Sequence, residues 1–125
     1  MGYTYDTGML LAVERGQRLA SGLHRRALDR GVTITVPAPV LAQAWRGGPQ
    51  ATLSRALRGC TVAVLDEARA RSVGALCALA GTADVVDAAV VVGALERGDV
   101  VLTSDPQDLA RLAAPIDPSL EIRRI

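Results

Sequence analysis

The sequence predicts a single α/β domain in which a parallel sheet of four to five strands is covered by helices on both faces. Three observations favour this class. Strand-like runs alternate with helical patterns, no short hairpin turn links two strands, and the middle strands lack a strict polar–apolar alternation. At 125 residues, of which 50% are hydrophobic, the chain has the size of one domain, residues 1–125, and can bury a core.

Runs rich in β-branched and aromatic residues predict the strands. The first run is "YTY", the middle runs are "VTITV", "TVAVL" and "VVLT", and "LEIRRI" ends the sequence as an edge strand. The expected strands are residues 3–5, 32–36, 61–65, 100–103 and a short strand within 120–125. The sheet therefore needs only short strands, each connected to the next by helical segments.

Helical spacing of apolar residues, with glycine and proline as stops and starts, predicts the segments between the strands. Pro37 and Pro39 open one helix, and Gly47, Gly48 and Pro49 break it. The other expected helices are 8–14, one within 16–31, 50–57, a long one capped by Asp66 and reaching 79, 84–96 and 105–112.

Composition narrows the classes of function. A net charge of +1 gives no strongly basic surface, and all 14 basic residues are arginine, so a mechanism that needs a lysine amine is excluded. Arginine suits phosphate and carboxylate groups, which keeps contact with RNA open. Cys60 and Cys77 match no metal or redox spacing. Because Asp6 interrupts the N-terminal segment and the longest apolar stretch, 88–95, is short, we expect a soluble cytoplasmic domain with no membrane contact.

Four acids follow strands or begin a helix in positions that could converge. Asp6 follows the first strand and Asp105 follows the fourth. Ligands of open parallel sheets bind beyond the carboxyl ends of the strands, so these two carboxylates approach each other if the two strands are neighbours. Asp84 and Asp87, three residues apart, lie on one face of a helix whose remainder is apolar. That helix should pack on the sheet with its acidic first turn beside the strand ends.

Each acid also has a structural interpretation. Asp84, Asp105 and Asp6 each precede a helix and are good N-caps. Asp87 is different, because it lies inside a helix among apolar neighbours. Burying a carboxylate there is costly unless the group is paired or binds a metal.

Four acids drawn together need a compensating positive charge. The chain has no lysine, and no arginine adjoins Asp6, Asp87 or Asp105 in the sequence. A divalent cation would remove the repulsion, and ligands that are all oxygen favour Mg²⁺ or Mn²⁺ over zinc. The only histidine, His24, stands beside Arg25 and Arg26 and is expected on a solvated helix face rather than among the ligands.

Four segments resemble the PIN-domain ribonucleases, and among them the VapC-type toxins of toxin–antitoxin pairs. They are "YDTGMLLAV", "VPAPVLAQAWRG", "DVVDAAVVVGAL" and "VLTSDPQDLARL", in the order and spacing of that family and over essentially the whole chain. The combination of "DxxDA" with "TSDPQDL" is moderately specific, whereas "DT" alone is not. The resemblance implies a PIN-like fold.

The resemblance also implies a set of site residues. Asp6, Asp87 and Asp105 match three of the family's four acids, as catalytic residues and metal ligands, and Asp84 matches an accessory acid. Gln43 stands where the family usually has glutamate. Its amide carbonyl can coordinate a cation but carries no charge and cannot act as a base. The supporting hydroxyl positions are matched by Thr7, Thr103 and Ser104.

The implied activity is hydrolysis of RNA phosphodiester bonds by an endoribonuclease that depends on Mg²⁺ or Mn²⁺ and pairs with a cognate antitoxin. Asp6 and Asp87 would hold the ion, and Asp105 would orient the attacking water or bind a second ion. The family often forms homodimers. Two alternatives stay open: a PIN-like module, weakened by Gln43, that binds RNA or a partner protein, and a phosphoacceptor receiver domain, which the absence of lysine disfavours.

Overall fold

The structure is a computed structural model that describes residues 1–125. Its strands are β1 (Tyr3–Tyr5), β2 (Ile34–Pro37), β3 (Cys60–Ala63), β4 (Val100–Thr103) and β5 (Ile122–Arg124). All neighbouring strands are parallel, and their order in the sheet is β3-β2-β1-β4-β5. The predicted fold class is thus confirmed. β2 begins two residues later than expected, and β3 ends at residue 63 instead of 65.

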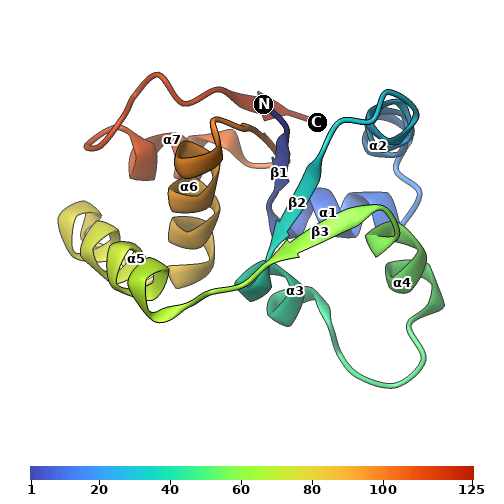
Figure 1. Ribbon diagram of the computed structural model, residues 1–125, viewed down its shortest axis with the longest axis horizontal. Coiled ribbons are helices and arrows are strands. Elements are labelled where there is room, and N and C mark those ends of the chain that lie inside the picture. The colour runs from blue at the N-terminus through green and yellow to red at the C-terminus, as the bar shows by residue number, and fades with distance from the viewer.

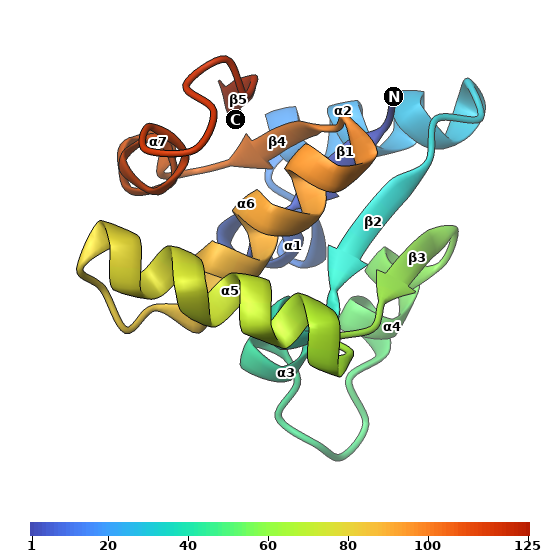
Figure 2. The ribbon, with the colours of Figure 1, turned by 60° about the vertical axis from the view of Figure 1, so that its left-hand side comes forward.

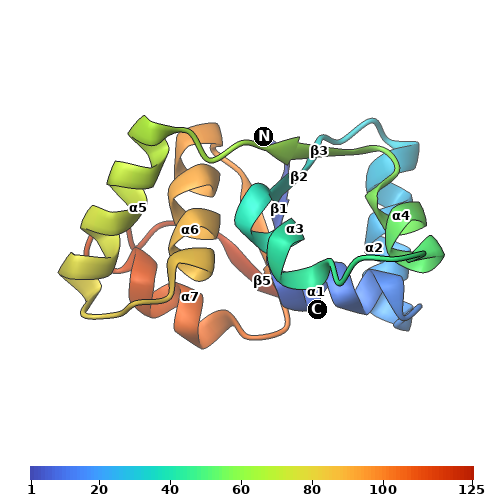
Figure 3. The same cartoon turned by 90° about the horizontal axis from the view of Figure 1, so that it is seen from below.

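Seven helices connect the strands and pack in two groups. They are α1 (Thr7–Glu14), α2 (Arg18–Asp29), α3 (Ala38–Ala44), α4 (Ala51–Leu57), α5 (Glu67–Ala80), α6 (Val85–Arg97) and α7 (Pro106–Ala113). α1 packs with α2 and α4, and α6 packs with α5 and α7. Figure 1 and Figure 3 show these two groups on opposite sides of the sheet, with α3 between them in contact with both α1 and α6.

Helix α6 is the centre of the core. It crosses β1, β2 and β4, and Figure 2 shows it lying against the sheet. Seven consecutive residues of α6 are buried, from Ala88 to Ala94. The apolar run therefore packs on the sheet as predicted, and the acidic first turn of α6 is carried to the strand ends. No single helix is long and apolar enough to cross a membrane, and only the bent pair of α5 and α6 reaches that length together.

A buried polar network closes the amino end of the sheet, opposite the candidate site. The Asp99 carboxylate is 7% exposed and accepts hydrogen bonds from the Gly2 backbone N–H at 2.9 Å and from the Thr4 hydroxyl at 2.8 Å. It also pairs with the Arg97 guanidinium at 2.9 Å. Because each polar group has a partner, the network joins the start of the chain to the end of α6 without an unsatisfied buried atom.

His24 corrects one expectation from the sequence. It is buried, at 9% exposure, and its Nδ1 lies 2.8 Å from the hydroxyl of Tyr5. Arg25 and Arg26, which follow it in the sequence, are exposed, because a helix turns by about 100° per residue and so moves them off its inner face. His24 instead shares the inner face of α2 with Ala20 and Ala27, four residues before and three after it. The expectation of a solvated histidine was wrong.

Candidate active site

Asp6 is the buried acid at the carboxyl edge of the sheet. It follows β1 and caps α1, because its Oδ1 accepts a hydrogen bond from the Met9 backbone N–H at 2.8 Å. Its Oδ2 accepts a hydrogen bond from the Thr103 hydroxyl. The pKa of Asp6 lies above its ordinary value, mainly because the carboxyl group is buried. The two hydrogen bonds oppose this rise, and the charge of Asp105 adds to it. The helix cap predicted from the sequence is therefore present, and the same carboxylate also binds the neighbouring strand β4 through Thr103.

Thr103 connects Asp6 to Asp105. β1 and β4 are adjacent and parallel, with Tyr5 opposite Leu102, so the two strands end at the same edge. The Thr103 hydroxyl donates to Asp6 and accepts from the Asp105 backbone N–H at 2.9 Å. Asp105 stands at the N-cap position of α7, yet its side chain makes no capping hydrogen bond and is exposed. The predicted approach of Asp6 and Asp105 follows from this pairing of strands.

Asp84 and Asp87 bring a third element to the same edge. Asp84 caps α6 by accepting a hydrogen bond from the Asp87 backbone N–H at 3.0 Å. Asp87 is half-buried, and burial, followed by the charges of Asp84 and Asp6, raises its pKa to about 7. Asp87 therefore changes its protonation state near neutral pH, which neither an exposed cap nor a paired carboxylate would do.

Gln43 and the hydroxyl residues complete the surroundings. The Thr7 hydroxyl donates to Gln43 Oε1 at 2.5 Å, so α3 is joined to the start of α1. Ser104 is exposed and lies over Gly8, where a Cβ would collide with its hydroxyl oxygen. The structure thus places every expected supporting residue at this edge of the sheet.

Two further residues were not expected at the site. A cavity of about 350 Å³ lies beside Asp84 and Asp87, and Asp108 and Arg111 on α7 also line it. Asp108 and Arg111 form an ion pair at 3.5 Å between largely exposed side chains, and Asp108 adds to the upward shift of the Asp87 pKa. The sequence signal is the spacing of residue 108 from residue 105, which places Asp108 in the first turn of α7. Asp6 and Asp105 do not line this cavity.

The chemistry of the acids suits a divalent cation. None of Asp6, Asp84, Asp87 and Asp105 has an arginine within salt-bridge distance. Their oxygen atoms are the ligand type that Mg²⁺ and Mn²⁺ prefer. No group of three acidic, histidine or cysteine side chains, however, is close enough to hold an ion as the side chains stand. The donor set therefore fits a cation in charge and ligand type, and binding would require exposed carboxylates such as Asp105 to turn inward.

The strand order, the parallel pairing and the seven helices define a PIN-like α/β fold. Three solved structures share it. A crystal structure of VapBC2 from Rickettsia felis bound to a DNA fragment from their promoter aligns with a TM-score of 0.73 and 14% identity, over 100% of this chain and 99% of that one.

A toxin–antitoxin complex from Klebsiella pneumoniae aligns with a TM-score of 0.66 and 16% identity, over 87% of this chain and 91% of that one. The crystal structure of PAE2754 from Pyrobaculum aerophilum aligns with a TM-score of 0.62 and 16% identity, over 97% of this chain and 90% of that one. No protein-family model matches the sequence, and no curated protein matches it significantly. At such low identity the likeness concerns the fold, and the predicted resemblance is confirmed at that level.

Proposed function

We propose that the protein is an endoribonuclease that hydrolyses RNA phosphodiester bonds with Mg²⁺ or Mn²⁺, as the toxin of a toxin–antitoxin pair. One observation carries the proposal. Asp6 and Asp105 follow two adjacent parallel strands, Asp87 lies alongside, and none of the three has a cationic partner. The fold is that of chains from toxin–antitoxin structures, which supports the same class.

Each residue has a proposed role. Asp6 and Asp87 would hold the ion, which supplies positive charge to polarise a phosphate oxygen and to lower the pKa of a water. Asp105, exposed beside them, would orient the attacking water. The Thr103 hydroxyl holds the Asp6 carboxylate and the Asp105 backbone close to each other through its two hydrogen bonds. Asp84 stabilises the first turn of α6 as its N-cap.

The protonation of Asp87 couples metal binding to pH. With a pKa of about 7, Asp87 carries a proton in part of the molecules at neutral pH when no cation is bound. Ligation requires the ionised form, so binding should release a proton and strengthen as the pH rises.

The biological setting belongs to the same proposal. Two of the structures that share the fold come from toxin–antitoxin systems, which supports a cognate antitoxin as partner. We further propose that the chain acts as one domain, that it forms a homodimer and that it works in the cytoplasm. The free thiols of Cys60 and Cys77 are compatible with a reducing compartment.

The test is cleavage of single-stranded RNA by the purified protein with Mg²⁺ or Mn²⁺ and with EDTA. We expect cleavage with either metal, none with EDTA, and a loss of at least about 100-fold for Asp87→Asn. Glu67→Gln is the matched control, because it removes the same charge from an exposed residue on α5. Cleavage that survives both EDTA and Asp87→Asn would refute the proposed site.

A second function is favoured by the position of Gln43. Its carbonyl oxygen already accepts a hydrogen bond from Thr7, and an amide supplies no negative charge for a cation. A module that binds RNA or a partner without efficient cleavage would have this feature. RNA binding in a gel-shift assay without cleavage at saturating Mn²⁺ would favour this second function.

A further inference from the structure

A second cavity lies away from the acids, at the other end of α1. Its volume is about 360 Å³, and residues of α1, α2 and α4 line it. α1 begins at Asp6 and ends at Glu14, and Glu14 belongs to the cavity wall. The cavity is therefore separated from the candidate active site by the length of that helix.

His24 stands in the wall of this cavity with one nitrogen free. It is more than nine-tenths buried, and Nδ1 is its only atom hydrogen-bonded to the protein. No buried polar side-chain atom lacks a partner, so Nε2 must retain contact with solvent, and the cavity is where His24 meets it. Burial lowers the pKa of His24 and so favours the neutral ring.

The bond to Tyr5 decides which nitrogen carries the proton. Tyr5 is fully buried, and its hydroxyl has no other partner than His24. If Nδ1 carried the ring proton, the phenolic hydrogen would be left buried without an acceptor, which is costly. The tyrosine therefore donates to Nδ1, and Nε2 carries the proton. The imidazole presents an N–H donor to the cavity.

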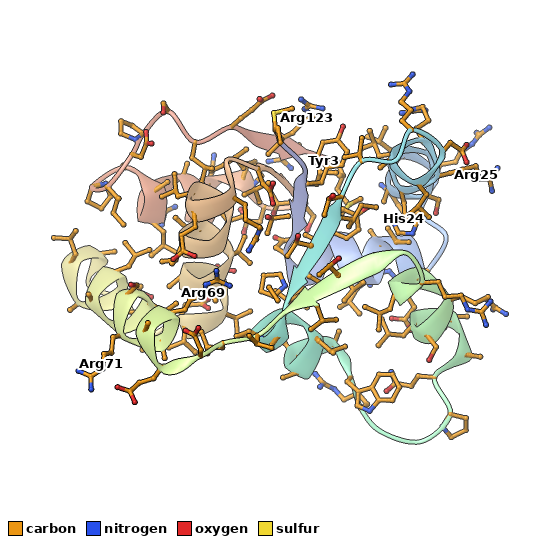
Figure 4. All side chains as sticks on the ribbon, in the orientation of Figure 1. Tyr3, His24, Arg25, Arg69, Arg71 and Arg123 are labelled. Atoms are coloured by element: carbon orange, nitrogen blue, oxygen red, sulfur yellow. The ribbon has the colours of Figure 1, made fainter.

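Three arginines surround the same cavity. Arg25 comes from α2, Arg55 from α4 and Arg58 from the residue that ends α4. None of them is paired with a carboxylate within 4 Å. Two acids, Glu14 and Asp29, also line the wall, so the cavity has one positive charge in excess. Figure 4 shows His24 and Arg25 on α2, at the opposite end of the molecule from Arg71 on α5.

We propose that this cavity binds a phosphate group of a nucleotide or of an RNA strand, at a site separate from the acidic cluster. Guanidinium and imidazole N–H donors come from two helices and converge on one cavity. A tetrahedral phosphate offers acceptor oxygens in several directions, whereas a carboxylate offers two in one plane. The hydroxyl of Ser21 in the wall adds a donor of the kind that contacts phosphates, whereas the Thr52 hydroxyl donates to Glu14 at 3.4 Å.

The single histidine makes the proposal directly testable. Metal-free protein labelled with ¹⁵N is titrated with inorganic phosphate, with adenosine monophosphate and with a short single-stranded RNA, and the Nε2 resonance of His24 is followed by NMR. We expect a saturable shift of that resonance. Because neither metal nor cleavage is needed, this test can fail or succeed independently of the proposed nuclease activity.

Variants assign the shift to the cavity. The double variant Arg55→Gln/Arg58→Gln should bind at least about tenfold more weakly, since each charge-assisted hydrogen bond contributes on the order of a tenfold change. Arg71→Gln, which removes an exposed arginine from α5, should bind as the wild type does.

A shift with phosphate or adenosine monophosphate identifies free phosphates as ligands, and a shift with RNA alone identifies the strand. Two results would overturn the proposal: no shift with any of the three probes, or an equal affinity in the double variant. A shift with hexaglutamate in place of the phosphates would assign the cavity to a protein partner.

Discussion

At the scale of single residues, Asp87 couples the stability of the fold to pH. Its pKa rises from 3.8 to about 7 on folding, because the carboxyl group becomes half-buried beside Asp84 and Asp6. The folded protein therefore holds a proton that the unfolded chain has released between these two values. Asp87 contributes stability that is complete below pH 4 and is lost as the pH rises towards 7.

Replacing this carboxyl group should remove that dependence. In the absence of metal, Asp87→Asn should be more stable than the wild type at pH 7.5 by about 1 kcal/mol, less than the full shift implies because the group is partly solvated. The two proteins should be about equally stable at pH 4.5. Urea denaturation at both pH values measures this. A strong loss of stability at pH 7.5 would make Asp87 a structural residue.

Gln43 tests the match to the family pattern. Gln43→Glu keeps an acceptor for the Thr7 hydroxyl and adds a negative charge near the acids, so Mn²⁺ should bind about tenfold more tightly. Calorimetric titration of Mn²⁺ compares the variant with the wild type. Gln17→Glu is the control, because Gln17 caps α2 far from the acids. Equal affinities would mean that residue 43 faces away from the ion.

At the scale of elements, the close approach of α1 to the β4–α7 turn depends on Gly8. A Cβ at this position would overlap the Ser104 hydroxyl oxygen, while the Ser104 Cβ would remain 3.5 Å away. The obstacle is therefore a single atom. Gly8 allows Ser104 to stand over the first turn of α1, beside Asp6.

A double-mutant cycle measures this constraint. Gly8→Ala should destabilise the wild type or displace Ser104, whereas in the Ser104→Ala background the same change should stabilise α1 by about 0.5 to 1 kcal/mol, the usual preference of a helix for alanine. Thermal unfolding of the four proteins gives the result. An equal effect of Gly8→Ala in both backgrounds would show that the two residues do not interact.

The positions of the helices and strands were largely predictable from the sequence, whereas the contacts that each side chain makes with other elements were not. Asp66, Asp84 and Asp6 cap their helices as expected, because an N-cap depends on residues two or three positions away. The adjacency of β1 and β4 could only be assumed, since it depends on the whole sheet. His24 was misjudged because its burial depends on Tyr5, which contacts it from another element.

At the scale of the whole molecule, the network around Asp99 joins β1, α6 and β4. Asp99→Ala would leave the Gly2 N–H and the Thr4 hydroxyl without their acceptor, and Arg97 without its carboxylate. We expect a loss of about 3 kcal/mol in the free energy of unfolding. Glu67→Ala, which breaks an exposed ion pair on α5, should change it little. Urea denaturation distinguishes the two, and similar small losses would show that the network contributes no more than a surface pair.

Metal binding should also act on the whole molecule. A cation bound only by the folded state stabilises it, by about 2.7 kcal/mol at a concentration one hundred times the Kd. Mn²⁺ should therefore raise the melting temperature of the wild type by several degrees, and much less that of Asp87→Asn. Sodium chloride of the same ionic strength is the control. An equal rise with sodium chloride would show general screening of charge.

The order of the strands also determines when the candidate site can form during synthesis. Asp6 leaves the ribosome near the start, but the hydroxyl that holds it belongs to a residue 97 positions later. Until β4 emerges, the central strand β1 has a neighbour on one side only. At ordinary rates of translation, this interval lasts about 5 to 20 s. If the proposed function holds, the growing chain is inactive during this interval, and a chain truncated before β4 stays inactive. A partner protein translated at the same time can therefore be present before the activity arises.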